Sequence, residues 1–233
     1  MGYKKISGVH RMGSGAEIYH KNAGTYFLFS EAEDKPGHIM KYLKRELRNK
    51  TVLDVGCGNG KYIKELAPVT AHYIGLDYST DQLHIAKRAL QCNSALIRGL
   101  GQESGIKPQS VDAAVAIWVL ESVRNTNQQA SIVGEMQRVL KPHGVIYVIE
   151  NSGDSEFEHI IKREPDICTT AETRDWLIGN GFHEARAVQT HFLFSSIKDA
   201  KDVFTTIWGD SIGSRIVDNR ICHNVKIYKK VVP

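Results

Sequence analysis

The sequence has few cysteines, no long apolar run and little excess charge, and each absence narrows the class of protein. The four cysteines include no Cys-x-x-Cys pair and the ten histidines show no metal-pair spacing, so we expect neither disulfides nor a metal site. Scattered reduced thiols of this kind predict a cytoplasmic protein. No apolar run approaches the roughly 20 residues that cross a bilayer, and the N-terminus lacks a signal peptide's apolar stretch. We therefore expect no membrane contact.

A strongly positive charge, which is typical of nucleic-acid-binding proteins, is also missing. The 30 lysines and arginines exceed the 26 acidic residues by only +4, which does not by itself argue for a nucleic-acid partner. The densest basic group lies within residues 41–48, on the helical face opposite Ile39, Leu43 and Leu47. This spacing predicts the solvated face of an amphipathic helix rather than a stripe that binds phosphates.

The order of apolar runs between residues 51 and 150 indicates an α/β fold. Strand and helix patterns alternate there at βαβ spacing, and the strands are continuous apolar runs. We expect strands at 51–55, 72–76, 95–98, 111–119 and 145–150, and helices at 61–67, 79–90 and 126–140. The pattern predicts a parallel sheet covered by helices on both faces, and right-handed crossovers limit it to a doubly wound topology.

The flanking regions differ from this core, although the whole chain fits one domain of 233 residues. Residues 1–35 show weak periodicity and predict an N-terminal lid of loops and short helix, after which a helix begins near Pro36. The C-terminal part, 151–233, predicts two more strands, which bring the sheet to seven mostly parallel strands. A helical insertion at about 195–219 is expected before the last strand.

The strongest local signal is Val52–Gly60, an apolar strand that runs into three closely spaced glycines and then a helix. Glycines let the backbone turn sharply and let a ligand approach the main chain, and a helix N-terminus adds free amide donors. Lys61 stands where a dinucleotide motif would have its third glycine. Asp54, two residues before the first glycine, would repel a pyrophosphate but suit a cation. The motif therefore predicts a site for a positively charged ligand.

A second acid ends the second expected strand. Asp77 follows Gly60 by 17 residues, and an acid at this place can accept hydrogen bonds from ribose hydroxyls. Alternatively, Asp77 only caps the next helix, at whose start Ser79 and Gln82 form a capping box. We favour ribose binding, because the glycine turn precedes Asp77 at the right distance.

These motifs and two later blocks resemble those of the class I S-adenosylmethionine-dependent methyltransferases with a type 11-like domain. The four blocks follow the family's order, at 52–60, 73–79, 110–123 and 135–144. The resemblance implies a Rossmann-like methyltransferase fold, methyl transfer as the reaction and S-adenosylmethionine as the cofactor. It also implies that 36–150 is the cofactor-binding core.

The resemblance further implies which residues contact the cofactor. They are Asp54, Gly56, Cys57, Gly58, Asp77, Tyr78, Leu100, Gly101, Gln102, Ile117 and Trp118. Among them, Asp77 would hold the ribose, Tyr78 would pack on the adenine, and Trp118 would lie near the methionine moiety. The family usually has an acid where Leu100 stands, so Gln102 or a main-chain carbonyl must accept from the adenine amino group here.

The residues that bind the methyl acceptor are less well defined, and the sequence identifies no catalytic residue. Methyl transfer from a sulfonium needs alignment and exclusion of water, and it needs a base only where the acceptor loses a proton. Candidates lie past the fourth and fifth strands, in the lid and in the insertion: Glu121, Ser122, Glu150, Asn151, Tyr19, His20, Tyr26 and Trp208. Helix capping, lid packing or surface exposure can also explain each of them.

The insertion leads to a hypothesis about the acceptor. It carries Phe204 and Trp208 on an amphipathic helix, and together with residues 10–35 it would form an aromatic, enclosed pocket. Such a pocket favours a small organic molecule. On this hypothesis, deleting 197–218 leaves cofactor binding intact and abolishes turnover.

Three functions stay open at this level. The first is methyl transfer to oxygen, nitrogen or sulfur of a small organic molecule. The second is a tRNA or rRNA methyltransferase, because Gly58–Tyr62 looks like the glycine loop of some tRNA wobble-uridine methyltransferases. The third is a non-catalytic partner protein that only binds S-adenosylmethionine. A nicotinamide-dependent dehydrogenase is disfavoured by the glycine spacing and by Asp54.

Overall fold

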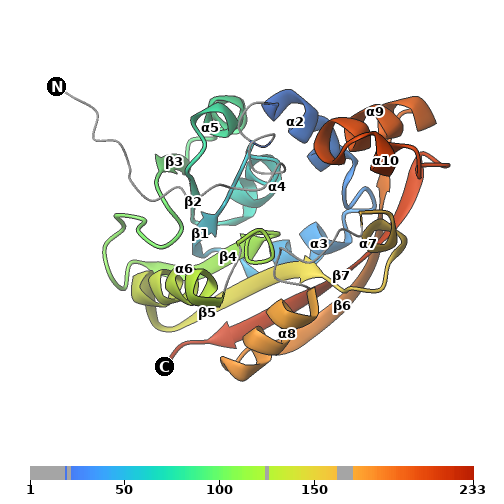
Figure 1. The fold of residues 1–233 in the computed structure, drawn as a ribbon. Helices are drawn as coiled ribbons and strands as arrows, with labels where there is room; N and C mark the ends of the chain where they lie inside the picture. Colours follow the sequence, from blue (N-terminus) through green and yellow to red (C-terminus); the bar gives the residue numbers. More distant parts are fainter. Residues whose placement is uncertain (1–18, 20–21, 124–125, 162–169) are drawn as a thin grey trace, which may run out of the picture.

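A seven-stranded sheet forms the centre of the computed structural model, which describes Tyr19 and residues 22–123, 126–161 and 170–233 (Figure 1). The strand order is β3-β2-β1-β4-β5-β7-β6. The strands are β1 Thr51–Val55, β2 His72–Asp77, β3 Ser94–Arg98, β4 Val111–Ile117, β5 Leu140–Asn151, β6 His183–Leu193 and β7 Arg220–Val231. Strands β1 to β5 pair in parallel, and β7 runs antiparallel to β5 and β6. The expected doubly wound, mostly parallel sheet is confirmed.

Helices cover both faces of this sheet (Figure 1). They are α2 Ala23–Ala32, α3 His38–Glu46, α4 Ile63–Leu66, α5 Thr80–Ala86, α6 Thr126–Val139, α7 Glu156–Ile161, α8 Thr170–Gly179, α9 Ile197–Trp208 and α10 Asp210–Gly213. Helices α3 and α4 bury Leu43 and Ile63 in one cluster with Val52, whereas α6 buries Met136 in a second cluster with Leu53. The alternation of neighbouring β1 residues between the two clusters is the period of two of a strand covered on both sides. None of the helices in the described ranges is long and apolar enough to cross a bilayer.

Several expected boundaries were wrong by a few residues. Strand β4 ends at Ile117 instead of continuing to residue 119, and β5 begins at Leu140, which was expected to belong to the preceding helix. The helix expected from Pro36 begins at His38. Leu90, the last residue of the helix expected over 79–90, follows a short 3-10 turn and is 40% exposed. In each case the helix or strand begins or ends a few residues away from the limit of the apolar pattern.

The insertion before β7 packs against the N-terminal lid. Helix α9 buries the expected face, which includes Phe204, and α2 of the lid contributes Phe29 to the same aromatic cluster. The rings of Phe29 and Phe204 have centroids 6.1 Å apart, and Phe157 of α7 also contacts both rings. The lid and the insertion, more than 160 residues apart in sequence, therefore share one core.

Candidate functional site

The glycine loop joins β1 to α4 through a left-handed backbone path. Gly56, Gly58 and Gly60 have φ angles of +74°, +53° and +77°, a region that residues with a Cβ rarely adopt. A Cβ on Gly56 would lie 2.6 Å from Cγ2 of Val119, so no side chain fits there. The amide of Gly56 donates to the carbonyl of Leu76 at 2.7 Å. The loop therefore lies against the carboxyl ends of β2 and β4, where doubly wound folds bind ligands.

Asp77 lies at the end of β2, and its carboxylate faces the glycine loop. Its Oδ2 accepts from the amide of Gly58 at 2.9 Å, and its Oδ1 accepts from the amide of Ser79 at 2.8 Å. Ser79 caps the first turn of α5, because its Oγ accepts a hydrogen bond from the amide of Gln82 at 3.3 Å. Ser79 is thus the helix cap, while the carboxylate of Asp77 faces the loop, and ribose binding by Asp77 stays a prediction.

The hydroxyl of Tyr19, in the N-terminal lid, reaches the same carboxylate. It donates to Oδ2 of Asp77 at 2.8 Å, and the Tyr19 ring stacks on Tyr78 with centroids 6.3 Å apart. Gln82 donates from Nε2 to the carbonyl of Tyr19 at 2.8 Å and fixes the main chain. Burial, followed by the charge of Asp77, raises the pKa of Tyr19 well above its usual value, so its hydroxyl stays a donor. The lid thus closes on the acid expected to bind the ribose.

Asp54, the other acid of the motif, is buried within the sheet. It accepts a hydrogen bond from the hydroxyl of Tyr73 on β2. Burial raises the pKa of Asp54 to about 7; the hydrogen bond from Tyr73 opposes this shift and the charge of Asp77 adds to it. A cation near the two acids would stabilise their ionised forms. The residues present therefore fit a sulfonium nucleoside, which carries both a positive charge and ribose hydroxyls.

The residues expected around the adenine follow β3. Leu100 and Gly101 are half-buried, whereas Gln102 is exposed. A Cβ on Gly101 would lie 3.2 Å from Cγ1 of Val55, so this segment runs close to the end of β1. The contact of these three residues with adenine stays a prediction.

The chain bends sharply where β4 ends. Trp118 has a φ of +55°, which is strained for a bulky side chain. Its indole Nε1 is buried without a hydrogen-bond partner among the described residues, and the preceding Ile117 is 8% exposed. Strained backbone of this kind concentrates at ligand-binding positions. The expectation that Ile117 and Trp118 lie beside the ligand stays a prediction.

Two buried carboxyl groups lie just past β4 and at the end of β5. Oε1 of Glu150 accepts from the amide of Leu120 at 2.7 Å, and Oε2 of Glu121 accepts from Nδ2 of Asn151 at 2.5 Å. Burial raises the pKa of Glu121 to about 7. Burial, followed by the charge of Glu121, raises the pKa of Glu150 well above its usual value. The structure therefore brings together the two acids that were expected past these strands.

His223 on β7, which lies in no motif of the sequence, joins this group. Its Nε2 lies 2.8 Å from Oδ1 of Asn151, and its ring stacks on Phe192 with centroids 4.8 Å apart. Burial, followed by the charge of Lys61, lowers its pKa to about 3, so the ring is neutral. A signal was present in the sequence: His223 stands between Ile221 and Val225 in an alternating strand, on the face that is buried.

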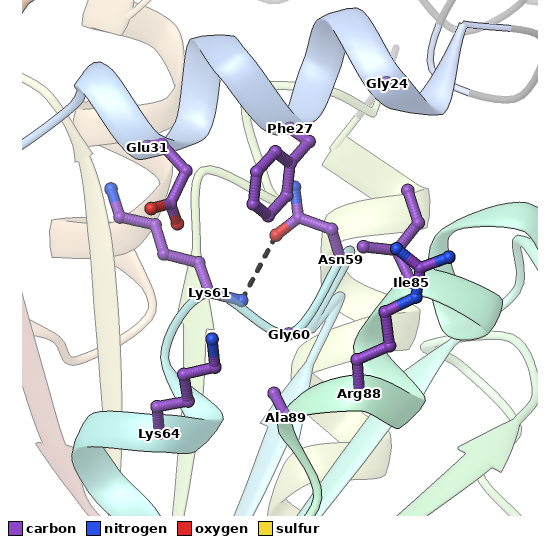
Figure 2. A pocket seen from close by; sticks show the side chains of 10 residues that line it. All are labelled: Gly24, Phe27, Glu31, Asn59, Gly60, Lys61, Lys64, Ile85, Arg88 and Ala89. Carbon is purple, nitrogen blue, oxygen red and sulfur yellow. Dashed lines mark hydrogen bonds between the residues drawn. The ribbon is translucent and has the colours of Figure 1, made fainter.

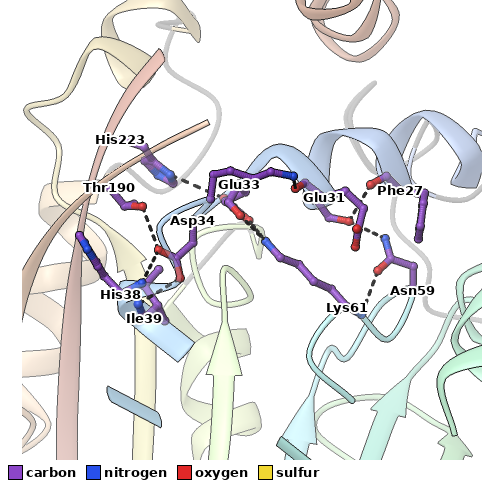
Figure 3. A network of polar contacts seen from close by, with 12 residues as sticks. Phe27, Glu31, Glu33, Asp34, His38, Ile39, Asn59, Lys61, Thr190 and His223 are labelled. Atoms are coloured by element: carbon purple, nitrogen blue, oxygen red, sulfur yellow. Dashed lines mark hydrogen bonds and ion pairs between the residues drawn. The ribbon is translucent and has the colours of Figure 1, made fainter. Parts of the chain in front are cut away.

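A polar network continues from His223 to the glycine loop (Figure 3). Nδ1 of His223 lies 3.7 Å from Oε1 of Glu33, and the other carboxylate oxygen lies 3.8 Å from Nζ of Lys61. Burial raises the pKa of Glu33 to about 8 and lowers that of Lys61, so for both groups desolvation outweighs their mutual attraction. The ammonium also donates to the carbonyl of Glu33 at 2.8 Å. The network fixes the end of the lid against both the loop and β7.

Comparison with known proteins identifies the architecture. The family model described as "Methyltransferase domain" matches residues 53–148, the segment that holds the glycine loop, Asp77, Trp118 and Glu121. Residues 53–148 therefore carry a domain of the S-adenosylmethionine-dependent methyltransferase type. S-Adenosylmethionine is accordingly the cofactor implied for the site formed by the glycine loop and Asp77.

Relatives of the methyltransferase domain act on different kinds of acceptor, to judge from their names. "Probable tRNA methyltransferase 9B" of Bos taurus is 26% identical over 148 residues, which are 64% of this chain and 31% of that protein. The demethylmenaquinone methyltransferase of Oceanobacillus iheyensis is 35% identical over 109 residues, 44% of each chain. Among solved structures, the YcgJ protein of Bacillus subtilis shares the fold with a TM-score of 0.58 at 14% identity, covering 84% of this chain and 98% of that one. The chain thus spans under half the length of these two curated relatives.

A pocket of about 250 Å³ opens on the outer side of the methyltransferase domain's glycine loop, under α2 (Figure 2). The rings and side chains that line it include Phe27 and Glu31 above, Lys64 below and Arg88 from the segment after α5. Neither Asp77 nor the buried glutamates line it. The pocket is therefore separate from the site predicted from the sequence.

The remaining expected residues lie in or next to the aromatic cluster between lid and insertion. Trp208 packs on Phe29 and Phe204 with centroids 5.3 and 4.9 Å away, and Tyr26 meets Tyr19 edge-on at 5.0 Å. Their role in binding an acceptor stays a prediction. His20 lies outside the described residues. Within the described ranges, the structure contains no group of three or more side chains that could hold a metal ion.

Proposed function

We propose that the protein transfers a methyl group from S-adenosylmethionine to a small organic acceptor. The observation that carries this proposal is the adjacency of two sites along one edge of the sheet. The glycine loop and Asp77 form a cradle for a sulfonium nucleoside, and the buried carboxyl groups of Glu121 and Glu150 follow at the ends of the next two strands. A buried, polar acceptor site of this kind suits a small molecule.

The chain's own residues would act mainly by binding and alignment. Asp77 would accept from the ribose hydroxyls, and the loop residues Gly56 and Gly58 leave room for the ligand to approach the main chain. The cofactor, when bound, supplies a methyl group on a sulfonium whose leaving group is a neutral thioether.

Isothermal titration with S-adenosylhomocysteine tests the cofactor half of the proposal. The wild-type protein is expected to bind this nucleoside and to ignore NAD, and Asp77→Asn is expected to weaken binding about 10-fold or more, because a hydrogen bond to a charged group is worth about 1.5–3 kcal/mol. Asp202→Asn, which alters an exposed carboxylate on α9, serves as the matched control. No binding at millimolar concentration would refute the assignment.

A tRNA or rRNA acceptor is the second candidate, supported by the relatives named as tRNA methyltransferases. The basic face of α3 offers limited charge for it, because Lys44 pairs with Glu65 at 2.5 Å and Arg45 pairs with Glu46 at 2.9 Å. If RNA is the acceptor, binding of unfractionated tRNA should weaken steeply as salt rises. A salt-independent, weak signal would favour the small molecule.

A non-catalytic role as a cofactor-binding partner protein is the third candidate, since a fold does not determine an activity. A transfer assay that follows formation of S-adenosylhomocysteine separates this candidate from the other two. The expectation of a cytoplasmic location, based on scattered cysteines, stays a prediction.

A further inference from the structure

Buried polar atoms without partners gather where β4 and β5 end. Among the described residues, no hydrogen bond is made by Nε1 of Trp118, Oε1 of Glu121, Oε2 of Glu150 or Nδ1 of His223. Leaving a buried polar atom unpaired costs the hydrogen bonds that it would make with water. Several such atoms in one place therefore indicate that a ligand completes the hydrogen bonding.

These side chains form one connected group. Asn151 bridges Glu121 and His223, at 2.5 Å from Oε2 of the glutamate and 2.8 Å from Nε2 of the histidine. The His223 ring stacks on Trp118 with centroids 5.8 Å apart. Glu150 is close enough to Glu121 for the two charges to interact. The unpaired atoms of Trp118, Glu121 and Glu150 thus belong to a single site next to the strained Trp118, whereas Nδ1 of His223 faces Glu33.

The chemistry of this site favours ligands that donate hydrogen bonds and carry positive charge. Because the amide nitrogen of Asn151 donates to Glu121, its oxygen must face Nε2 of His223, which therefore carries the ring proton. Nδ1 is then an acceptor, like the free oxygen of Glu121. The face of the Trp118 indole also attracts cations.

We propose, on the basis of the function proposed above, that the methyl acceptor is a small amine bound beside Trp118 between Glu121 and Glu150, with Glu121 as its proton acceptor. The bound ammonium gives one proton to the carboxylate of Glu121, which leaves a neutral amine. The nitrogen lone pair forms the new bond to the methyl carbon while the carbon–sulfur bond breaks and its electron pair stays on sulfur. The products are the methylated ammonium and the neutral thioether, and Glu121 returns its proton to water.

An amine is a better acceptor than an alcohol or a phenol when Glu121 is the base. An alcohol is a far weaker acid than an ammonium, so a carboxylate is a poor base for it. A phenol would place a developing negative charge between two carboxyl groups, which repel it. An ammonium that gives its proton to Glu121 leaves a neutral amine, which a buried site accommodates at lower cost than an anion.

His223 would act as a positioning residue in this site. Its Nε2 proton fixes the orientation of the Asn151 amide, which in turn holds Oε2 of Glu121 and leaves Oε1 directed at the ligand. His223→Gln keeps a donor for Asn151, whereas His223→Phe keeps the ring stack on Phe192 and removes the donor. We expect the phenylalanine variant to lower kcat with little change in KM for the cofactor, and the glutamine variant to restore part of the loss.

The test compares isosteric acceptors with the intact chain. Phenethylamine and 2-phenylethanol are offered with S-adenosylmethionine, and formation of S-adenosylhomocysteine is measured; unfractionated tRNA is a third acceptor. We expect transfer to the amine only, and a loss of at least about 100-fold in kcat for Glu121→Gln. Glu184→Gln, an exposed glutamate on β6, is the matched control and should leave the rate unchanged. Binding of S-adenosylhomocysteine to each variant shows that it has folded.

The outcomes are distinct. Transfer to 2-phenylethanol or to tRNA but not to the amine overturns the amine proposal, as does full activity of Glu121→Gln. If the protein binds S-adenosylhomocysteine but neither methylates phenethylamine nor binds it at millimolar concentration, the amine proposal is also overturned. The proposed function is not affected by that result. Failure to bind S-adenosylhomocysteine at all refutes the proposed function itself.

Discussion

The hydroxyl of Tyr19 donates a hydrogen bond to the carboxylate of Asp77 across 2.8 Å, and it joins the N-terminal lid to the end of β2. A Cβ on Gly58 would lie 3.1 Å from this hydroxyl, so the phenol sits directly over the glycine loop. We expect the ribose hydroxyls of the cofactor to bind the same carboxylate. On this expectation, Tyr19 and the cofactor compete for Asp77.

Tyr19→Phe should tighten the binding of S-adenosylhomocysteine. The phenylalanine ring keeps the stack on Tyr78 but removes the competing donor, and a hydrogen bond to a charged group is worth about 1.5–3 kcal/mol, or about 10-fold or more in Kd. Isothermal titration measures the change. Tyr26→Phe, which alters a neighbouring ring that makes no contact with Asp77 in the described structure, is the control. Weaker binding by Tyr19→Phe would show that the hydroxyl supports the cofactor instead.

Two glycine-to-alanine substitutions should have opposite effects on stability. Gly56→Ala places a Cβ 2.6 Å from Cγ2 of Val119 at a φ of +74°. We expect this variant to lose about 2 kcal/mol or more of unfolding free energy and to lose cofactor binding. Gly134→Ala, in the exposed interior of α6 with nothing within 4 Å, should stabilise by about 0.5–1 kcal/mol. Urea unfolding of both variants measures the difference. Equal effects would contradict the described loop geometry.

Glu33→Gln should flatten the pH dependence of thermal stability. Burial raises the folded-state pKa of Glu33 to about 8, above its ordinary value of 4.5. Between these two values the unfolded chain has lost the proton that the folded chain keeps, so stability falls as pH rises. The slope of Tm against pH between about 5 and 8 should therefore be shallower in Glu33→Gln than in the wild type. It should not vanish, because Asp54 and Glu121, with pKa values of about 7, act in the same direction.

The control for this measurement is Glu184→Gln, which changes an exposed carboxylate paired with Lys226 at 2.9 Å. The wild-type slope should persist in it. An unchanged slope in Glu33→Gln would show that Glu33 is ionised in the folded protein.

Phe204→Ala should destabilise the fold while the remaining folded protein still binds S-adenosylhomocysteine. The Phe204 ring is fully buried between lid and insertion, and removing such a ring costs about 3–5 kcal/mol. Thr206→Ala, exposed on the same helix, should change stability by less than about 0.5 kcal/mol. Deleting 197–218 is a poorer test of the insertion, because it exposes this whole cluster. Thermal unfolding with and without S-adenosylhomocysteine checks both variants, and an undiminished Tm in Phe204→Ala would contradict the packing.

Much of the site expected to bind the cofactor was predictable, because the sequence motifs that form it are local. The three glycines, Asp77 and Ser79 lie within one βαβ unit, and the backbone conformation and helix cap that they require can be read from residue type and spacing. The acceptor end was only partly predictable. Glu121 and Glu150 were selected from their place past two strands, but nothing in the sequence showed that Glu150 would be buried or that Glu121 would be half-buried with one oxygen shielded from water.

The sequence by itself determined the alternation of strand and helix, the glycine loop and the class of ligand that fits it, because these depend on residues close together along the chain. Only the tertiary structure decided that Tyr19 meets Asp77, that Glu33 and Lys61 share a buried network, and that His223 joins Asn151. Each of these contacts links residues between 28 and 72 positions apart. Contacts over such separations depend on strand order and on the antiparallel entry of β7, which local periodicity does not specify.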